Sequence, residues 1–470
     1  MRGLASNREL WLLGALLVCF VLFHFDFTNS DDTRQRPGSA LVKSAQPVDK
    51  NDATSSQSDA SDFPQTRITH HAFGWTIIER LYVINGTMFI VTDKPTEVPM
   101  LKFVLSPGIT IENDPEWHNR RLPTDKDIRV LTVNEADPFF KGKTPIVLPG
   151  NTFMTTDNRQ FLTHYYHFVA ELMFGLWRTY SALDPNIDPD GKTILPPVAR
   201  WSFPHVSTKH WRDYAHMNEW IFRAAFPGAG LEFLEDWEER AAAPGRVYVY
   251  DRVILGDRIA AYEGERFVAT MRTAANAFAL PGSPHWWATM RANVVEFAGV
   301  FPADDDAAYK KGVITYISRQ GWGRRMLREA DHLALVAELE KLHTEYGYEV
   351  NIVSMDKLTR EKQMRLAART TIMMGVHGNG LTALLWMKPS QRSTVMEFFY
   401  PDGFAFDYEW TTRVLGMTHY GFWNNETFTS PGLPPMKYPE GFQGNDIPLD
   451  GKAVAKLCIE RLSLIEEADD

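Results

Sequence analysis

The residues best suited to chemistry form a glycine-rich turn, Gly-Val-His-Gly-Asn-Gly, at residues 375–380. Apolar runs flank the turn, so the pattern predicts a strand, the turn and a short helix. Gly375, Gly378 and Gly380 let the backbone pass close to a ligand, and the free N–H groups at a helix start favour a phosphate. His377 can donate a hydrogen bond to a phosphate oxygen or carry a proton. We therefore expect a phosphate-bearing ligand at this turn.

Two other interpretations of this turn are a dinucleotide site and a purely structural turn. The glycine spacing is not G-x-G-x-x-G, which argues against a dinucleotide enzyme. Glycines in a tight turn between a strand and a helix can also serve packing alone. A single acid, Glu397, ends the next apolar run, and its presence together with His377 favours a ligand site.

The elements that must position this turn alternate regularly from residue 311 onwards. The pattern predicts strands and helices in the order strand 312–317, helix 325–346, strand 348–353 and helix 357–369, followed by strand 370–374, the turn and strand 394–399. Strands that alternate with helices indicate a parallel, doubly wound α/β sheet. We expect this sheet to bind its ligand at the carboxyl ends of its strands.

Polar residues follow several of these predicted strands. They are Ser318 and Arg319 after the first strand, with Arg324 and Arg325 in the loop beyond, then Ser354, the glycine turn and Glu397. Guanidinium groups recognise phosphate oxygens through paired hydrogen bonds. An arginine cluster, a glycine turn and a late carboxylate at one sheet edge fit a nucleotide diphosphate and its ribose.

The first half of the chain has its strongest helical pattern at residues 161–183, where aromatic and aliphatic residues recur at helical spacing. His164, His167 and Glu171 lie on adjoining turns, and the last two are four residues apart, so they share a face. Such a pair could act as general base and orienting carboxylate. It could equally be a buried polar pair with a structural role. A metal site would need a third ligand, which no diagnostic spacing supplies.

The remainder of this half is rich in short strand patterns. Runs between residues 68 and 148 predict a strand-rich region, and residues 246–259 predict a further strand. Residues 201–226 interleave Trp, His and Arg, which suits either a carbohydrate-binding surface or a loop and helix packed on the domain. We expect an acceptor-side domain over residues 67–300 and a nucleotide-binding domain over residues 301–470.

Composition limits the possible partners of this chain of 470 residues. Its net charge of −10 comes with no basic block, which argues against nucleic acid as a partner. Of its two cysteines, Cys19 lies in an apolar N-terminal run and Cys458 near the C-terminus, so they cannot form a disulfide framework within the body.

The N-terminus has the pattern of a signal anchor. Arg2 and Arg8 precede an apolar run at residues 10–25, and no small-x-small cleavage site of a signal peptide follows. We expect a cytoplasmic tail (1–9), a transmembrane signal anchor (10–27) and a disordered stem (28–66), with a cleaved signal peptide as the alternative.

This topology would make the protein a single-pass type II protein of the Golgi or endoplasmic reticulum membrane, with its body in the lumen. Two sequons, at Asn85 and Asn425, would then be glycosylated.

The motifs together resemble glycosyltransferase family 61. The resemblance rests on Tyr-Ile-Ser-Arg at 316–319 with Arg324 and Arg325, Gly-Val-His-Gly-Asn-Gly-Leu-Thr at 375–382, Val-Met-Glu-Phe at 395–398, and His-Tyr-Tyr-His-Phe at 164–168 with Glu171. It implies a GT-B-like fold of two Rossmann-like domains, a UDP-sugar donor and inverting transfer, usually without a metal. The chain departs from the family pattern at Val376, Asn379, Ala383 and Arg328, which bears on the identity of the donor sugar.

The resulting hypothesis is an inverting glycosyltransferase that moves a sugar of the xylose or N-acetylglucosamine class from a UDP-sugar to a glycan or glycoprotein. Arg319, with Arg324 or Arg325, would bind the diphosphate, and Glu397 the ribose hydroxyls. His377 would stabilise the leaving group, and His167 or Glu171 would be the base. The alternative is a non-catalytic, membrane-anchored protein of the same fold that binds carbohydrate or nucleotide sugar.

Overall fold

The computed structural model describes residues 63–112, 114, 116–300 and 311–465. The expected anchor and tail lie outside these residues, and among the described residues no helix is both long and apolar enough to span a membrane. The expected stem also lies outside them, apart from its last four residues. Phe63 is buried, and the Tyr82 hydroxyl donates to the Pro64 carbonyl. The folded body thus begins a few residues earlier than predicted, because Phe63 packs against Tyr82 and Phe140.

The first half of the body is built on an eight-stranded mixed sheet with the order β4-β3-β2-β8-β5-β6-β7, in which β1 also pairs with β2. Four of the strands, β5 to β8, run parallel, whereas β2 is antiparallel to its neighbours β1, β3 and β8. The strands are β1 (Arg67–Ala72), β2 (Trp75–Ile84), β3 (Thr87–Val91), β4 (Ile128–Leu131), β5 (Thr144–Thr155), β6 (Val198–Ser202), β7 (Gly230–Glu232) and β8 (Arg246–Gly256).

The predicted strand-rich region is therefore present, although the pattern at residues 101–111 forms the 3₁₀ turn η3 (Leu101–Phe103) and a loop. Helices cover the sheet and connect its strands. They are α2 (Trp117–Arg120), α3 (Val133–Phe140), α4 (Arg159–Leu162), α5 (Phe174–Tyr180), α6 (Met217–Ala225), α7 (Leu234–Ala242), α8 (Arg258–Ala261), α9 (Glu265–Thr270), η6 (Thr273–Ala279) and α10 (Ala288–Phe297).

The helix predicted at residues 161–183 is present but not continuous. It consists of α4, the π-helical segment η4 (His167–Met173), α5 and the 3₁₀ turn η5 (Ser181–Leu183). Gly175 explains its close fit to the sheet, because a Cβ at that position would lie 2.2 Å from the Trp75 ring. The π-helical segment changes the direction of the side chains along the helix and begins at His167.

The aromatic residues between 201 and 226 serve mainly as core. Trp201 and Trp211 are almost fully buried, and they pack around Phe222 on α6. The interpretation of this segment as a carbohydrate surface is therefore wrong for these two rings. Burial of large aromatic side chains at this site stabilises the first half, as expected of residues that remove so much apolar surface from water.

The second half is a six-stranded sheet with the order β10-β9-β11-β12-β13-β14, parallel except for β14. Its strands are β9 (Val313–Ile317), β10 (Glu349–Val353), β11 (Ile372–Val376), β12 (Thr394–Phe398), β13 (Thr418–Trp423) and β14 (Glu426–Phe428). Its helical segments are α12 (Glu329–Lys341), η8 (Leu342–Tyr346), η9 (Met355–Lys357), α13 (Arg360–Arg369), η10 (Asn379–Trp386), α14 (Phe406–Val414) and α15 (Gly451–Leu462).

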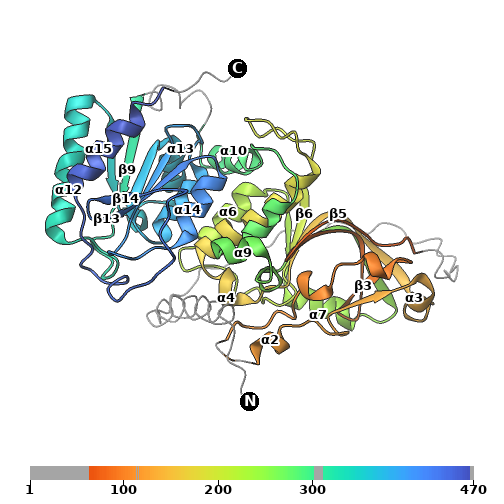
Figure 1. Ribbon diagram of the computed structural model, residues 1–470. Helices are drawn as coiled ribbons and strands as arrows, with labels where there is room; N and C mark the ends of the chain where they lie inside the picture. The colour runs from red at the N-terminus through yellow and green to blue at the C-terminus, as the bar shows by residue number, and fades with distance from the viewer. Residues whose placement is uncertain (1–62, 113, 115, 301–310, 466–470) are drawn as a thin grey trace, which may run out of the picture.

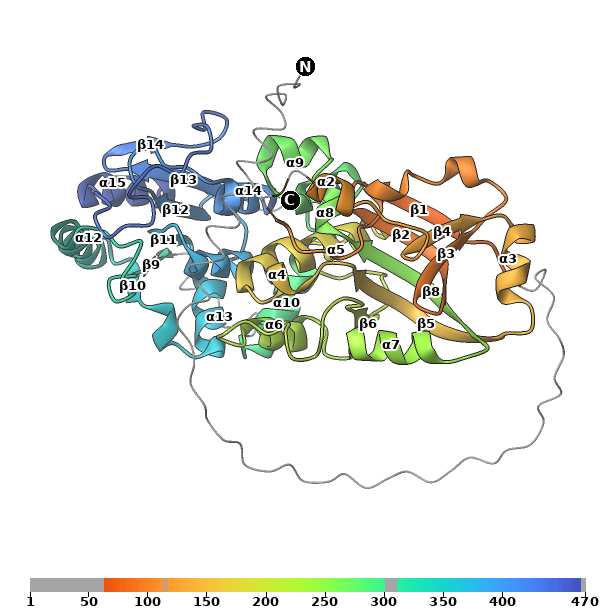
Figure 2. The same ribbon diagram turned by 90° about the horizontal axis from the view of Figure 1, so that it is seen from below.

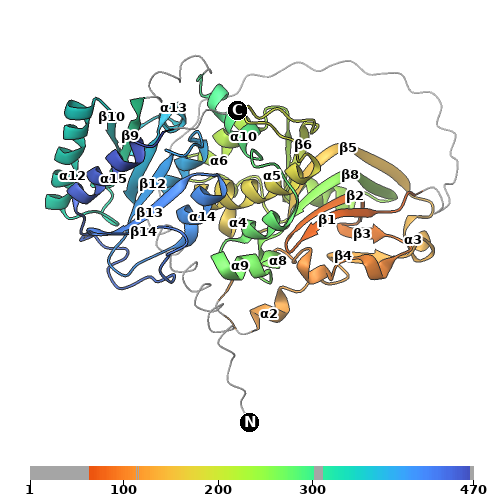
Figure 3. The ribbon, with the colours of Figure 1, turned by 45° about the horizontal axis from the view of Figure 1, so that its top comes forward.

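The predicted order of strands and helices in this half is confirmed, together with a parallel α/β sheet. The helix predicted from residue 325 begins instead at Glu329, because Arg325 has a positive φ of 53° that a helix cannot contain. In Figures 1 and 3, α12 and α15 lie on the outer side of this sheet, away from the first half.

The two sheets lie side by side with helices packed between them (Figure 2). Trp287 precedes α10 and donates from its indole to the Leu385 carbonyl at 2.9 Å. Arg291 on α10 donates to the carbonyls of Trp386 and Met387. A single apolar cluster runs from Trp75 in the first half to Trp410 in the second. The two halves thus share a core, and the domain boundary at residue 300 stays a prediction.

Candidate active site

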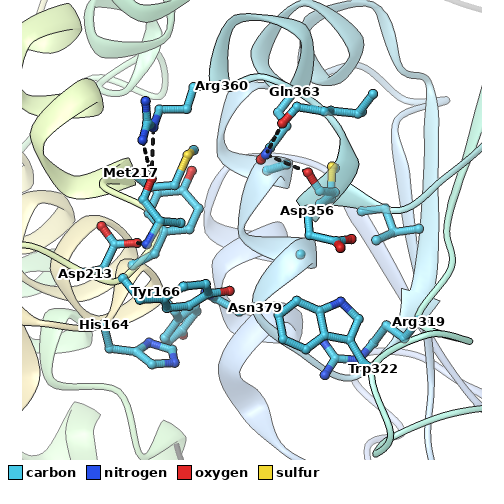
Figure 4. A pocket seen from close by; sticks show the side chains of 18 of the residues that line it. His164, Tyr166, Asp213, Met217, Arg319, Trp322, Asp356, Arg360, Gln363 and Asn379 are labelled. Atoms are coloured by element: carbon cyan, nitrogen blue, oxygen red, sulfur yellow. Dashed lines mark hydrogen bonds between the residues drawn. The ribbon is translucent and has the colours of Figure 1, made fainter. Parts of the chain in front are cut away.

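A cavity of about 730 Å³ lies where the two halves meet. Figure 4 shows His164, Tyr166, Asp213 and Met217 of the first half on one wall, and Arg319, Trp322, Asp356 and Gln363 of the second half on the other. Arg360 on α13 donates to the Ala215 carbonyl at 2.6 and 2.9 Å, which joins the two walls at one end. The cavity is large enough for a nucleotide-sized ligand.

The cavity lies at the carboxyl ends of β9 and β11, where the strand order reverses. From β9 the chain passes to β10 on one side and then returns to β11 on the other. Ser318 and Arg319 follow β9, and His377 follows β11, so the reversal places them together on the cavity wall. Open α/β sheets bind their ligands at this kind of position.

The glycines of the turn after β11 lie close to Ile317 and Arg319 at the end of β9. A Cβ on Gly375 would lie 2.9 Å from the Ile317 carbonyl oxygen, and one on Gly378 would lie 2.7 Å from an Nη atom of Arg319. Gly380 is similarly close to the Ile317 side chain, at 3.0 Å. Gly375 therefore serves packing between strands, whereas Gly378 makes room for a guanidinium group that faces the cavity.

Arg319, Arg324 and Arg325 all line the cavity, as the strand ends predicted. Arg325 is nearly buried, and its Nε donates to the side chain of Gln443 at 2.6 Å. The Arg319 guanidinium lies 5.6 Å from the centre of the Trp322 ring. Three guanidinium groups on one wall provide a site for a polyanion such as a diphosphate.

Glu397 lies behind His377 rather than on the cavity wall. Its carboxylate is fully buried, with Oε1 2.5 Å from Nδ1 of His377 and Oε2 2.9 Å from Nε2 of His419. Strand register places Glu397 between Gly375 on β11 and Gly421 on β13. The prediction that Glu397 contacts ribose hydroxyls is therefore corrected, because both of its oxygens are already bonded to histidine.

His167 and Glu171 form the predicted pair on the opposite wall. Nδ1 of His167 lies 2.8 Å from Oε2 of Glu171, and His167 lines the cavity while Glu171 is buried behind it. Burial alone would raise the pKa of Glu171, but His167, Arg272 and Arg258 lower it to about 2. A carboxylate with so low a pKa is a weak base, so Glu171 is suited to orienting His167.

Comparison with known families supports the resemblance seen in the sequence. The family model described as Glycosyltransferase 61 matches residues 165–396, a segment that contains His167, Glu171, Arg319 and His377. The match supports the assignment of residues 165–396 to glycosyltransferase family 61. The match suggests glycosyl transfer as the general activity. A search of curated proteins found no matching relative.

Arg272 and Asp407, which no sequence motif indicated, connect the two walls of this site together with Tyr166. Arg272 donates from Nη1 to Asp407 at 2.7 Å and to Glu171 at 3.3 Å, and the Tyr166 hydroxyl donates to the Asp407 carbonyl at 3.0 Å. Asp407 and Arg272 are far apart in the sequence, so only the fold brings them together. Asp407 also lines the cavity, and burial would raise its pKa, but Arg272 and His377 lower it.

Two acidic runs, Asp-Pro-Asp at 188–190 and Asp-Asp-Asp at 304–306, have the composition of a metal-binding motif. Asp188 accepts a backbone hydrogen bond from Lys192 in a loop, and residues 304–306 lie outside the described residues. Within the described part of the chain, no three His, Cys, Asp or Glu side chains gather closely enough to hold a metal ion.

Substitutions of Gly375 and Gly378 form a matched pair of tests, because the two glycines serve different purposes. Gly378→Ala should displace the Arg319 guanidinium and weaken UDP binding by about tenfold to a hundredfold, since a charged hydrogen bond contributes about 1.5–3 kcal/mol. Gly375→Ala should instead lower the melting temperature, because its Cβ would meet a backbone carbonyl that cannot move aside. Calorimetric titration with UDP and thermal unfolding of both variants measure this contrast. Equal effects of the two substitutions on stability and binding would contradict the assignment.

Proposed function

We propose that the protein is an inverting glycosyltransferase that uses a UDP-sugar donor. One observation carries the proposal: the arginines and His377 face a histidine–carboxylate pair across a single cavity. A single displacement needs a stabilised leaving group on one side of the anomeric carbon and a base for the acceptor hydroxyl on the other. Two walls of this composition could supply both in a GT-B-like arrangement.

The wall formed by the second half suits the donor. The diphosphate of the leaving UDP gathers negative charge as the glycosidic bond breaks. Arg319, Arg324 and Arg325 are always cationic at physiological pH and line this wall. His377 adds a hydrogen-bonding ring nitrogen beside them. Preorganised positive groups of this kind stabilise charge in the transition state more than water does.

The wall formed by the first half suits the acceptor. Glu171 fixes Nδ1 of His167, so Nε2 is the ring nitrogen that can accept a proton from an acceptor hydroxyl. Arg258 and Arg272 hold the Glu171 carboxylate in turn, and both are buried. His167 is thus the base in this proposal and Glu171 its positioning residue.

The acceptor is proposed to be a glycan or glycoprotein in the secretory pathway, and the sugar one of the xylose or N-acetylglucosamine class. The basic and apolar N-terminal pattern supports a type II membrane anchor. Asn85 and Asn425 lie in exposed turns, between β2 and β3 and between β13 and β14, where an oligosaccharide could be attached. We propose no resident metal, because the guanidinium groups can balance the diphosphate charge.

The test of this function is a panel of UDP-sugars offered to the purified protein with glycan and glycopeptide acceptors. UDP release together with a product whose anomeric configuration is inverted relative to the donor would support the proposal. Tight UDP-sugar binding without transfer to any acceptor would favour the non-catalytic alternative. Retained anomeric configuration would contradict a single displacement.

Arg319→Ala should weaken UDP binding by about 2–5 kcal/mol, at least about thirtyfold, while folding is little changed. The reason is that the guanidinium would otherwise meet the diphosphate in a site with little water. Titration calorimetry and thermal unfolding measure the two effects. Arg223→Ala is a suitable control, because Arg223 is exposed on α6 and pairs only with Glu219 among the described residues. UDP affinity equal to that of the control variant would contradict the role of Arg319.

A further inference from the structure

The loops that follow three neighbouring strands of the second sheet contribute to the cavity wall. The strands lie in the order β10, β9 and β11. Asp356 follows β10, Arg319 follows β9 and His377 follows β11, and all three side chains line the cavity. Because neighbouring strands lie about 4.8 Å apart, these residues form a row along one sheet edge with the Arg319 guanidinium in the middle.

The end of this row at β11 faces the proposed base. The Tyr408 ring contacts both His377 and Tyr166, with ring centres 5.6 and 5.3 Å apart. Tyr166 directly precedes His167, which is the base in the proposed function. The sugar that is transferred must lie between the base and the leaving diphosphate. It therefore belongs at the β11 end of the row.

The other end of the row is left for the nucleoside. In a nucleotide sugar the diphosphate joins the transferred sugar on one side to the ribose on the other. If the diphosphate lies at the arginines and the sugar extends towards β11, the ribose must extend towards β10. The loop after β10 is thus the part of this wall that the ribose would meet.

Asp356 is the acidic residue in that loop that is best placed for a ribose. It is exposed, and Figure 4 shows it on the same wall as Arg319 and Trp322. The Ser354 hydroxyl donates to Oδ1 of Asp356, and among the described residues no cation pairs with this carboxylate and no group donates to Oδ2. A carboxylate has about four positions that accept hydrogen bonds, so Asp356 can still accept from two hydroxyls.

The loop that carries Asp356 is held in place without a ligand. The Gln363 side-chain amide on α13 donates to the carbonyls of Met355 and Leu358 at 2.8 and 3.2 Å. The Met355 side chain also packs on the glycine turn, where a Cβ on Gly380 would lie 3.5 Å from it. A carboxylate that is already positioned loses little freedom when a ligand binds, which favours affinity.

We propose that Asp356 binds the two ribose hydroxyls of the nucleotide, the role from which Glu397 is excluded by its two histidine contacts. The inference rests on the proposed function, and it adds the direction of the donor: the nucleoside lies towards β10 and the transferred sugar towards β11. Charge supports this direction, because the Asp356 carboxylate attracts hydroxyl donors and repels phosphate oxygens, whereas Arg319 binds phosphate.

Calorimetric titration of the full-length protein with UDP and with its 2′-deoxy and 3′-deoxy analogues tests the inference. The native protein should bind each analogue about tenfold to a hundredfold more weakly than UDP, the effect of losing a hydrogen bond to a charged group. This preference should disappear in Asp356→Ala. It should be intermediate in Asp356→Asn, which keeps the shape and one acceptor oxygen. An unchanged preference in Asp356→Ala would overturn the proposal.

Asp251→Ala is the matched control, because Asp251 is exposed on β8 in the first half, and this variant should keep the native preference. Thermal unfolding confirms that each variant is folded.

ADP and GDP, titrated together with their deoxy analogues, separate this inference from the proposed function. Recognition of the ribose does not depend on the base. Binding of ADP or GDP in place of UDP, with the same dependence on Asp356, would support the inference and contradict a UDP-sugar donor. UDP binding with no contribution from Asp356 would overturn the inference alone. A protein that binds none of the three nucleotides would contradict both.

Discussion

Replacing His167 with alanine should lower turnover by about 10²–10⁴-fold, the usual effect of losing a general base, and leave UDP affinity unchanged. His167 lies on the wall opposite the arginines, and its Nε2 is the nitrogen that Glu171 leaves available. The substitution therefore removes the group that accepts the proton without touching the residues that bind the donor. Steady-state kinetics at saturating donor and UDP titration measure the two quantities.

Two further variants define what the His167 result means. Glu171→Gln should lower turnover less than His167→Ala, because the imidazole remains but loses the carboxylate that orients it. His343→Ala serves as the control, since His343 is exposed on η8 in the second half. Near-normal turnover in both His167→Ala and Glu171→Gln would place the base elsewhere, and Asp407 would be the next residue to replace.

Arg272→Met should destabilise the protein by about 3–5 kcal/mol, the effect of removing one partner from a buried ion pair. Arg272 is buried and donates to both Glu171 and Asp407, so its loss leaves two carboxylates without their cation. Methionine keeps most of the side-chain volume, which separates loss of charge from loss of packing. Urea unfolding followed by tryptophan fluorescence measures the change.

The control for Arg272 is Arg67→Met. Arg67 is largely exposed and pairs with Glu79 at 3.6 Å, and exposed pairs of this kind contribute at most about 1 kcal/mol. A destabilisation by Arg272→Met that is no larger than that of Arg67→Met would show that the two halves are held together without this network. Loss of activity without loss of stability would instead assign Arg272 to the chemistry.

The same network makes stability depend on pH in a defined direction. The pKa of Glu171 falls from an ordinary value of 4.5 to about 2 in the folded protein. The ionised form of Glu171 therefore stabilises the protein fully above about pH 4.5, and this stabilisation is lost as the pH falls towards about 2. Acid unfolding of native protein and Glu171→Gln measures it: the difference in stability between the two should shrink across this range. A constant difference would contradict the low pKa.

The sequence predicted the second half of the fold well, because its signals are local. Apolar runs bounded by glycine and polar residues predicted β9 to β12 and their order along the chain. The ends of these strands predicted that Arg319 and His377 lie close together. The roles of Glu397 and His419 could not be predicted. A residue at a strand end can face the ligand or the sheet interior, and the pattern of a short apolar run does not distinguish these directions.

Contacts between distant segments explain the remaining differences. The helix that breaks at His167 packs through Gly175 against Trp75, which is remote in sequence. The segment that contains Trp201 and Trp211 has the composition of a sugar-binding surface, but both rings pack against Phe222 in the core and are buried. The pairing of Arg272 with Asp407 likewise has no local signal, because it arises only when the two halves meet.

A crystal structure of the protein bound to UDP would test the central claim most directly. We predict that the diphosphate lies at the carboxyl ends of β9 and β11, within hydrogen-bond distance of Arg319 and of Nε2 of His377. His167 should face it across the cavity with room for a sugar and an acceptor hydroxyl between them. UDP bound away from this strand edge, or a diphosphate that contacts neither Arg319 nor His377, would contradict the account.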